Sequence, residues 1–216
     1  MHTQKGAIPG WVIGAIVVGV AILLLLSGRF FNARDAKEPV TVFTTPENLS
    51  GIQKGDAPWA PEIGNLVKRL RDIGLQPSEM EGAALHMHEH LTVFVNGASV
   101  EVPANIGIHS AARLMSPVHT HDTKGIIHVE SHTVQSFYLG QIFDVWGVYF
   151  TKDCIGGYCS DSEGNKKLSV YVNGALYAGD PRTLELKPHQ ELTIVYGTQA
   201  QLPNPIPSSY TFPPGY

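Results

Sequence analysis

The chain has 216 residues and a formal net charge of −4, with 43% hydrophobic and 16% charged residues. This length accommodates one domain, or two small ones, together with a membrane anchor. The basic residues are scattered, which argues against nucleic acid as a partner because phosphate binding requires clustered Lys and Arg. Histidine is the unusual residue, since eight of the ten lie within the 47 residues from His86 to His132.

A single transmembrane helix is predicted near the N-terminus. Residues 6–28 form a stretch of 23 residues without a charged side chain. As a helix this stretch would span roughly 34 Å, enough to cross a hydrocarbon core. A cleaved signal peptide is the alternative, but the apolar run is longer than is usual for one and no small-x-small cleavage site follows. We therefore expect the segment to be retained.

The orientation of the anchor is predicted from two signals that disagree. Three basic residues follow the helix and one precedes it, which favours a cytoplasmic C-terminal domain. Cys154 and Cys159, the two cysteines of the chain, flank a Gly-Gly turn and are expected to form a disulfide, which favours an oxidising compartment. Free thiols or metal ligands are the alternatives. We predict a single-pass membrane protein whose C-terminal domain lies outside the cytoplasm, in the periplasm or at the cell surface.

The chain divides into four predicted regions. Residues 1–28 are the anchor, and the Pro-containing residues 29–58 are a stalk. Residues 59–198 form a mostly-β, histidine-rich domain, and residues 199–216, with five prolines, form an extended tail. The domain is long enough to bury its own core.

One amphipathic helix and a series of short strands are predicted within the domain. The helix runs from Pro61 to Gly74. Two Val-Asn-Gly turns predict hairpins after residues 91–95 and 168–172. Further strands are expected at 125–131, 133–138, 147–151, 183–186 and 191–196, and one helical turn at 140–146. The predicted fold class is mainly β (α+β), a β-sandwich or a β-grasp-like domain with one amphipathic helix.

Three histidine-containing segments predict a transition-metal site. They are His86-Met-His-Glu-His90, His119-Thr-His-Asp122 and His128-Val-Glu-Ser-His132. Side chains two residues apart share one face of a strand, so an H-x-H pair supplies two nitrogens to one ion. Gly125 permits a reversal that returns His128 towards His119 and His121. One such pair would be weak support, whereas three segments in 47 residues are much stronger.

The residues of the predicted site have different roles. The ligands are expected to be His119, His121 and His128, joined by His88 and His90, with His86, Glu130 and His132 as secondary candidates. Asp122 is expected to orient a ligand imidazole. His109 and His189 are interpreted as ordinary loop or surface histidines.

The donor types favour copper or zinc as the metal, with iron third, because imidazole and carboxylate suit all three. Met87 and Met115 lie beside the cluster in sequence and would suit Cu(I), although methionine is also a common filler of protein cores.

Residues 85–146 resemble an uncharacterised family of membrane-anchored, histidine-rich proteins of bacteria and archaea. The resemblance is carried by the H-x-H-x-H segment that leads into Val95-Asn-Gly97, by Val102-Pro-Ala-Asn-Ile-Gly107, by His119-Thr-His-Asp122 with Gly125-Ile-Ile-His-Val-Glu130, and by Leu139-Gly-Gln-Ile-Phe-Asp-Val-Trp146. It implies membrane anchoring but no activity. His86-Met-His-Glu also resembles the H-x-H segment of copper-zinc superoxide dismutase, an analogy limited to this segment and the single disulfide.

The preferred functional interpretation is a tethered binding module that holds, delivers or buffers copper or zinc beside a membrane complex. A metalloenzyme with a His-ligated zinc or copper, hydrolytic or superoxide-dismutase-like, is the first alternative. A structural subunit of a membrane complex is the second. No catalytic residue is assigned, and the expected partners are the membrane and other subunits of such a complex.

Overall fold

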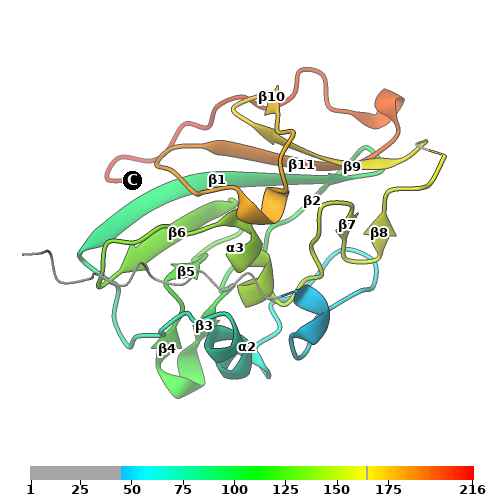
Figure 1. The fold of residues 1–216 in the computed structure, drawn as a ribbon. Coiled ribbons are helices and arrows are strands. Elements are labelled where there is room, and N and C mark those ends of the chain that lie inside the picture. Colours follow the sequence, from blue (N-terminus) through cyan, green and yellow to red (C-terminus); the bar gives the residue numbers. More distant parts are fainter. Residues whose placement is uncertain (1–44, 164) are drawn as a thin grey trace, which may run out of the picture. The chain divides into compact units, whose positions relative to one another are not determined.

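The computed structural model of the protein describes residues 45–163 and 165–216 (Figure 1). The predicted transmembrane helix and most of the predicted stalk lie outside these residues. Among the residues that are described, none of the helices combines the length and the apolar character needed to cross a membrane.

The centre of the domain is a mixed seven-stranded sheet in the order β10-β9-β11-β1-β6-β5, with β2 paired to β1. The two central strands β1 and β11 are parallel, and the other pairs are antiparallel. The strands are β1 (Leu85–Val95), β2 (Ala98–Val100), β5 (Val118–His119), β6 (Ile126–Ser131), β9 (Lys167–Val172), β10 (Ala175–Leu176) and β11 (Glu191–Gly197).

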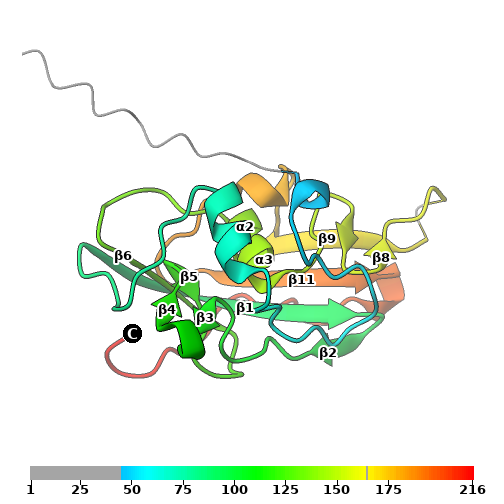
Figure 2. The same ribbon diagram turned by 90° about the horizontal axis from the view of Figure 1, so that it is seen from below.

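Besides the main sheet, the described residues form two small sheets and four 3-10 helical turns. The small sheets are β3 (Ile108–His109) with β4 (Leu114–Met115), and β7 (Cys154–Ile155) with β8 (Tyr158–Cys159). The turns are η1 (Pro46–Asn48), η2 (Ser110–Ala112), η3 (Pro181–Thr183) and η4 (Gln199–Gln201). Two-stranded sheets are too small to form the second layer of a sandwich. The domain is therefore α+β, with helices on one face of the main sheet (Figure 2).

The two α-helices of the described residues differ from their predicted lengths. Helix α2 (Leu66–Asp72) is shorter than expected because the backbone N–H of Glu62 donates to Trp146 and the Glu62 carboxylate pairs with Arg69. Helix α3 (Leu139–Trp146) has two turns instead of one. All of its residues are buried, including the polar Gln141 and Asp144.

Three predicted strands are irregular segments. Residues 133–138, 147–151 and 183–186 contribute only isolated bridges, such as the one between Tyr138 and Glu185. A strand requires a partner that continues in register over several residues, and period-two alternation in the sequence does not reveal whether that partner exists.

The two predicted hairpin turns are confirmed. Asn96 and Gly97 have φ values of 52° and 84°, and Asn173 and Gly174 have φ values of 50° and 81°. Two successive left-handed residues define the tight turn that matches the twist of a hairpin. These turns join β1 to β2 and β9 to β10.

The tail crosses the sheet face opposite the helices (Figures 1 and 2). Pro207 accepts a hydrogen bond from Thr193 Oγ1 at 3.5 Å, and the Tyr210 ring stacks on His90 with centroids 3.7 Å apart. At the other end of the described chain, Leu49 is buried and Gln53 donates its backbone N–H to Gly147. Residues from 46 onward therefore pack into the same unit.

Cys154 and Cys159 form a disulfide across the β7–β8 pair, where they are directly opposite each other. A structural disulfide persists in oxidising compartments and is rare in the cytosol. This bond is an indication that the domain lies outside the cytoplasm.

Candidate metal centre

Three neighbouring strands bring the histidine segments together at one end of the sheet. Strand β6 lies between β1 and β5. In this register His88 and His119 both lie opposite His128, one on each side, and His86 lies opposite Glu130. Residues as far apart in the sequence as His86 and Glu130 therefore direct their side chains to one place.

The return of the chain between β5 and β6 depends on Gly125. Its φ is +79°, and a Cβ at this position would lie 2.4 Å from the carbonyl oxygen of Leu91. That carbonyl belongs to β1, and Leu91 in turn donates its N–H to Gly125 at 2.8 Å. Only glycine fits here, and the predicted reversal is confirmed.

Two groups of side chains in this cluster have the spacing of a metal site. The first group is His86, His88, His128 and Glu130, and the second is His119, His121, His128 and Glu130. Within each group the potential ligand atoms all lie within 4.8 Å of one another. Five imidazoles and one carboxylate form these groups, a donor set that can hold a transition-metal ion.

The imidazole nitrogens of each H-x-H pair face each other directly. The Nε2 atoms of His86 and His88 are 3.2 Å apart, and those of His119 and His121 are 3.1 Å apart. Two ligands at roughly 2.0–2.1 Å from one tetrahedral ion would be separated by about 3.4 Å. Both pairs therefore have the bite required to chelate a single ion with little movement.

The orientation of His119 is fixed from behind by the backbone. Its Nδ1–H donates to the carbonyl of Ser116 at 3.0 Å, which leaves the lone pair of Nε2 directed at the cluster. A hydrogen bond of this kind on the distal ring nitrogen selects the tautomer that ligates a metal. We had expected Asp122 to play such a part, but its Oδ1 accepts the backbone N–H of Lys124.

Burial keeps several of these imidazoles neutral. It lowers the pKa of His88 to about 4, assisted by the neighbouring His128, and lowers the pKa of His119 to about 4. Burial also lowers the pKa of His121. Neutral imidazole is the form that binds metal, so these side chains are ready to ligate at neutral pH.

Glu130 supplies a buried negative charge whose hydrogen bonding is incomplete. Oε1 accepts from Nδ1 of His128 at 3.1 Å and lies 3.4 Å from Nε2 of His86. Oε2 is buried without a hydrogen-bond partner and lies 3.9 Å from Nε2 of His119. Burial acts to raise the pKa of Glu130, but the hydrogen bond from His128 and the proximity of His119 lower it overall. The carboxylate is therefore ionised at neutral pH, with one oxygen open to a cation.

Glu89 is a second buried carboxyl group, next to the site in sequence but not part of it. Side chains alternate along β1, which directs Glu89 to the opposite face from His88 and His90. Both of its carboxyl oxygens lack hydrogen-bond partners, and burial raises its pKa to about 9. Glu89 is therefore a neutral acid at pH 7.

His90 is not brought into either group, although it is on the same face as His88. It lies opposite Ile126, two residues beyond the His88–His128 pair. Its Nδ1 is 2.5 Å from Glu191 and its Nε2 is 2.9 Å from the carbonyl of Lys124. Both nitrogens are already engaged, so His90 has a structural role.

The other histidines of the described chain also have separate roles. His132 pairs with the hydroxyl of Ser78 at 2.9 Å, and Nδ1 of His109 accepts the N–H of Ala112. Nε2 of His189 lies 3.3 Å from the backbone oxygen of Tyr216. The sequence interpretation of His109 and His189 as ordinary loop residues agrees with these contacts.

Sequence analysis missed two side chains that border the cluster. The ring of Tyr216 lies 4.6 Å from that of His88 and 5.5 Å from that of His128. Glu81 lies 3.7 Å from Nε2 of His121. Neither side chain lies in a segment whose sequence indicates a metal site. They approach the cluster because the tail and the loop before β1 fold back towards it.

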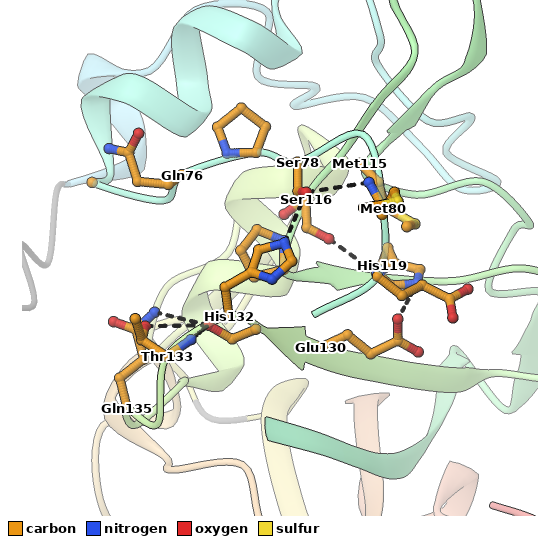
Figure 3. Close-up of a pocket in the computed structure, with 15 residues that line it drawn as sticks. Gln76, Ser78, Met80, Met115, Ser116, His119, Glu130, His132, Thr133 and Gln135 are labelled. Atoms are coloured by element: carbon orange, nitrogen blue, oxygen red, sulfur yellow. Dashed lines mark hydrogen bonds and ion pairs between the residues drawn. The ribbon is translucent and has the colours of Figure 1, made fainter. Parts of the chain in front are cut away.

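A cavity of about 270 Å³ opens beside the cluster. His119 and Glu130 form part of its wall and point towards each other, as Figure 3 shows. Met80, Met115 and His132 line other parts. The side chains of His119 and Glu130 are both buried at the wall of the cavity. Met115, a residue type that suits Cu(I), thus lines the cavity beside the cluster.

The fold and the site define a mainly β α+β domain with a candidate His/Glu metal centre. Comparisons with protein-family models, curated proteins and solved structures find no match to this chain. The resemblance to membrane-anchored, histidine-rich proteins therefore stays a prediction, and a functional assignment rests on the residues of the site.

Proposed function

We propose that this protein is a membrane-anchored, extracytoplasmic protein that binds a transition metal, copper or zinc, through His86, His88, His119, His121, His128 and Glu130. The observation that carries the proposal is the convergence of five imidazoles and one carboxylate in a largely buried site. Buried charge is costly unless it is paired or binds a metal. Holding, delivering or buffering the ion requires no further chemical groups.

Copper and zinc are favoured over other ions by the donor types. Five of the six side chains offer imidazole nitrogen, which suits zinc and copper, whereas magnesium and calcium require oxygen ligands. Iron is the third choice, because its common protein sites also combine histidine with carboxylate.

The test measures metal bound by the full-length chain, purified in detergent and equilibrated with Zn²⁺ or Cu²⁺ before gel filtration. The wild-type chain should retain the metal, and His128→Ala should retain less of it because His128 belongs to both groups. His109→Ala removes a histidine outside the groups and should bind as the wild type does. Equal retention by His128→Ala and His109→Ala would refute the proposal.

A metal-dependent enzyme is the second candidate, and the cavity beside His119 and Glu130 is the observation that favours it. An ion that keeps an open coordination position can activate water or bind a small oxygen species. Azide added to the Cu²⁺-loaded protein separates the candidates. A shift in the copper absorption spectrum indicates an open position and favours catalysis, whereas an unchanged spectrum indicates a saturated site.

A further inference from the structure

The candidate centre contains two ligand groups that overlap without coinciding. His128 and Glu130 belong to both, whereas His86 with His88, and His119 with His121, belong to one group each. Strand β6 carries the shared residues and lies between β1 and β5. The two H-x-H pairs are therefore on opposite sides of the shared residues.

The rings around His128 show the same division. His88 and His121 each meet the ring of His128 edge-on, with centroids 4.6 Å and 4.5 Å away and interplanar angles of 89° and 85°. Each pair also has its own chelating separation of 3.1–3.2 Å between Nε2 atoms. A single ion held by one pair would leave the imidazoles of the other pair without a cation.

Glu130 presents one carboxylate oxygen to each group. Oε1 lies 3.4 Å from Nε2 of His86, and Oε2 lies 3.9 Å from Nε2 of His119. Oε2 is also the buried oxygen that lacks a hydrogen-bond partner. A carboxylate with its two oxygens divided in this way is arranged to bridge two ions, which in protein sites of this kind are about 3.5–4 Å apart.

We propose that the centre binds two transition-metal ions, one chelated by His86 and His88 and the other by His119 and His121, with Glu130 bridging them. His128 ligates one of the two, and the other ion keeps a position for a solvent molecule. Glu81, 3.7 Å from Nε2 of His121, adds negative charge on the β5 side. This inference rests on the proposed metal-binding function.

The number of ions per chain is the first test, measured by metal analysis of the full-length protein in detergent with saturating Zn²⁺. The wild-type chain should bind two ions. The double variants H86A/H88A and H119A/H121A should each bind one, and the matched control H109A/H189A should bind two. One ion per wild-type chain would overturn the two-ion proposal and leave metal binding intact. No bound ion would overturn the proposed function as well.

The bridge is tested by electron paramagnetic resonance of the wild-type chain loaded with Cu²⁺. Two bridged Cu²⁺ ions should be spin-coupled and give a half-field transition, which should be lost in both double variants and in Glu130→Ala. The control H109A/H189A should keep it. Two Cu²⁺ ions per wild-type chain with uncoupled, single-ion spectra would contradict the bridge.

Discussion

Two buried polar regions lie in this domain, and they are completed in different ways. On the helix side of the sheet, Arg69 is fully buried and donates to the backbone carbonyls of Ser50, Asp144 and Val145 and to Glu62. Close by, Arg182 holds the Asp144 carboxylate through two hydrogen bonds of 2.8 and 3.1 Å. Here the guanidinium groups donate to carboxylate and carbonyl oxygens, all of which belong to the chain itself.

In the histidine cluster, by contrast, the hydrogen bonding is incomplete. The Nε2 atoms of its two H-x-H pairs face each other, and Oε2 of Glu130 is buried without a hydrogen-bond partner. A buried polar group left without a partner costs roughly 1–3 kcal/mol. The arginine network is complete without any added ion, whereas a cation bound in the cluster would supply the partner that Oε2 of Glu130 lacks. This difference distinguishes a structural polar network from a binding site.

The largest effect is expected from breaking the arginine network. Asp144→Ala leaves the buried guanidinium of Arg182 without its carboxylate and should lower the free energy of unfolding by about 3–5 kcal/mol. Urea denaturation with and without a chelator measures this change. The loss should be the same in both conditions, and a loss that appears only with bound metal would contradict the separation of the two regions.

Metal binding should stabilise the domain through the cluster alone. At a free Zn²⁺ concentration of one hundred times the dissociation constant, the unfolding free energy should rise by about 2.7 kcal/mol. The rise should be smaller in His128→Ala and persist in full in His109→Ala, as followed by thermal denaturation. A full rise in His128→Ala would show that zinc binds elsewhere.

Acid should destabilise the metal-free domain between pH 6.5 and 5. The folded-state pKa values of His88 and His119 are about 4, below the unfolded value of about 6.5, so protons favour the unfolded chain as the pH falls through this window. Each histidine contributes up to about 1.4 kcal/mol per pH unit. Glu89, with a folded-state pKa of about 9, acts in the opposite sense, and the two histidines outweigh it.

Urea midpoints of chelator-treated protein at several pH values measure this slope. The slope should be steeper in Glu89→Leu, which removes the opposing group, and shallower in His119→Gln. A midpoint that stays constant from pH 6.5 to 5 in the wild type and in Glu89→Leu would mean that these histidines are not buried.

The smallest effect is expected at Glu89 itself. Its carboxyl group is fully buried and unpartnered, so Glu89→Leu should raise the free energy of unfolding at pH 7 by about 1 kcal/mol. The Zn²⁺ content should stay unchanged because the side chain points away from the cluster. A destabilised variant would indicate that the carboxyl group has a partner in solution.

Much of the candidate site could be predicted because its signals are local. The two-residue spacing of His119 and His121 places both side chains on one face of an extended segment, and Gly125 marks the turn that returns His128 to them. The predicted meeting of His119, His121 and His128 with His88 agrees with the structure. His86 and Glu130, secondary candidates in the sequence, are in fact full members of the groups.

The contacts of His90 and Tyr216 could not be predicted because they depend on residues that are distant in the sequence. His90 shares the face of His88, yet its nitrogens are taken by Glu191, 101 positions away, and by the carbonyl of Lys124. The approach of Tyr216 to His88 likewise depends on the path of the tail. No local pattern encodes either contact.

The fold shows the same division between local and distant information. The Asn-Gly hairpins were predictable because the turn residues determine the backbone locally. Helix α3 is longer than predicted, and its polar residue Asp144 is buried because it pairs with the distant Arg182. The predicted strand at residues 147–151 has only bridge partners, at Gln53 and Ile155, and pairings of that kind are decided by tertiary packing.

The most direct test of the metal centre is anomalous diffraction at the zinc edge from crystals of the protein grown with Zn²⁺. If each H-x-H pair chelates an ion, anomalous density should lie about 2.0–2.1 Å from the Nε2 atoms of His119 and His121, with a second peak at the same distance from those of His86 and His88. Density confined to other places, with these imidazoles uncoordinated, would contradict metal binding by the histidine cluster.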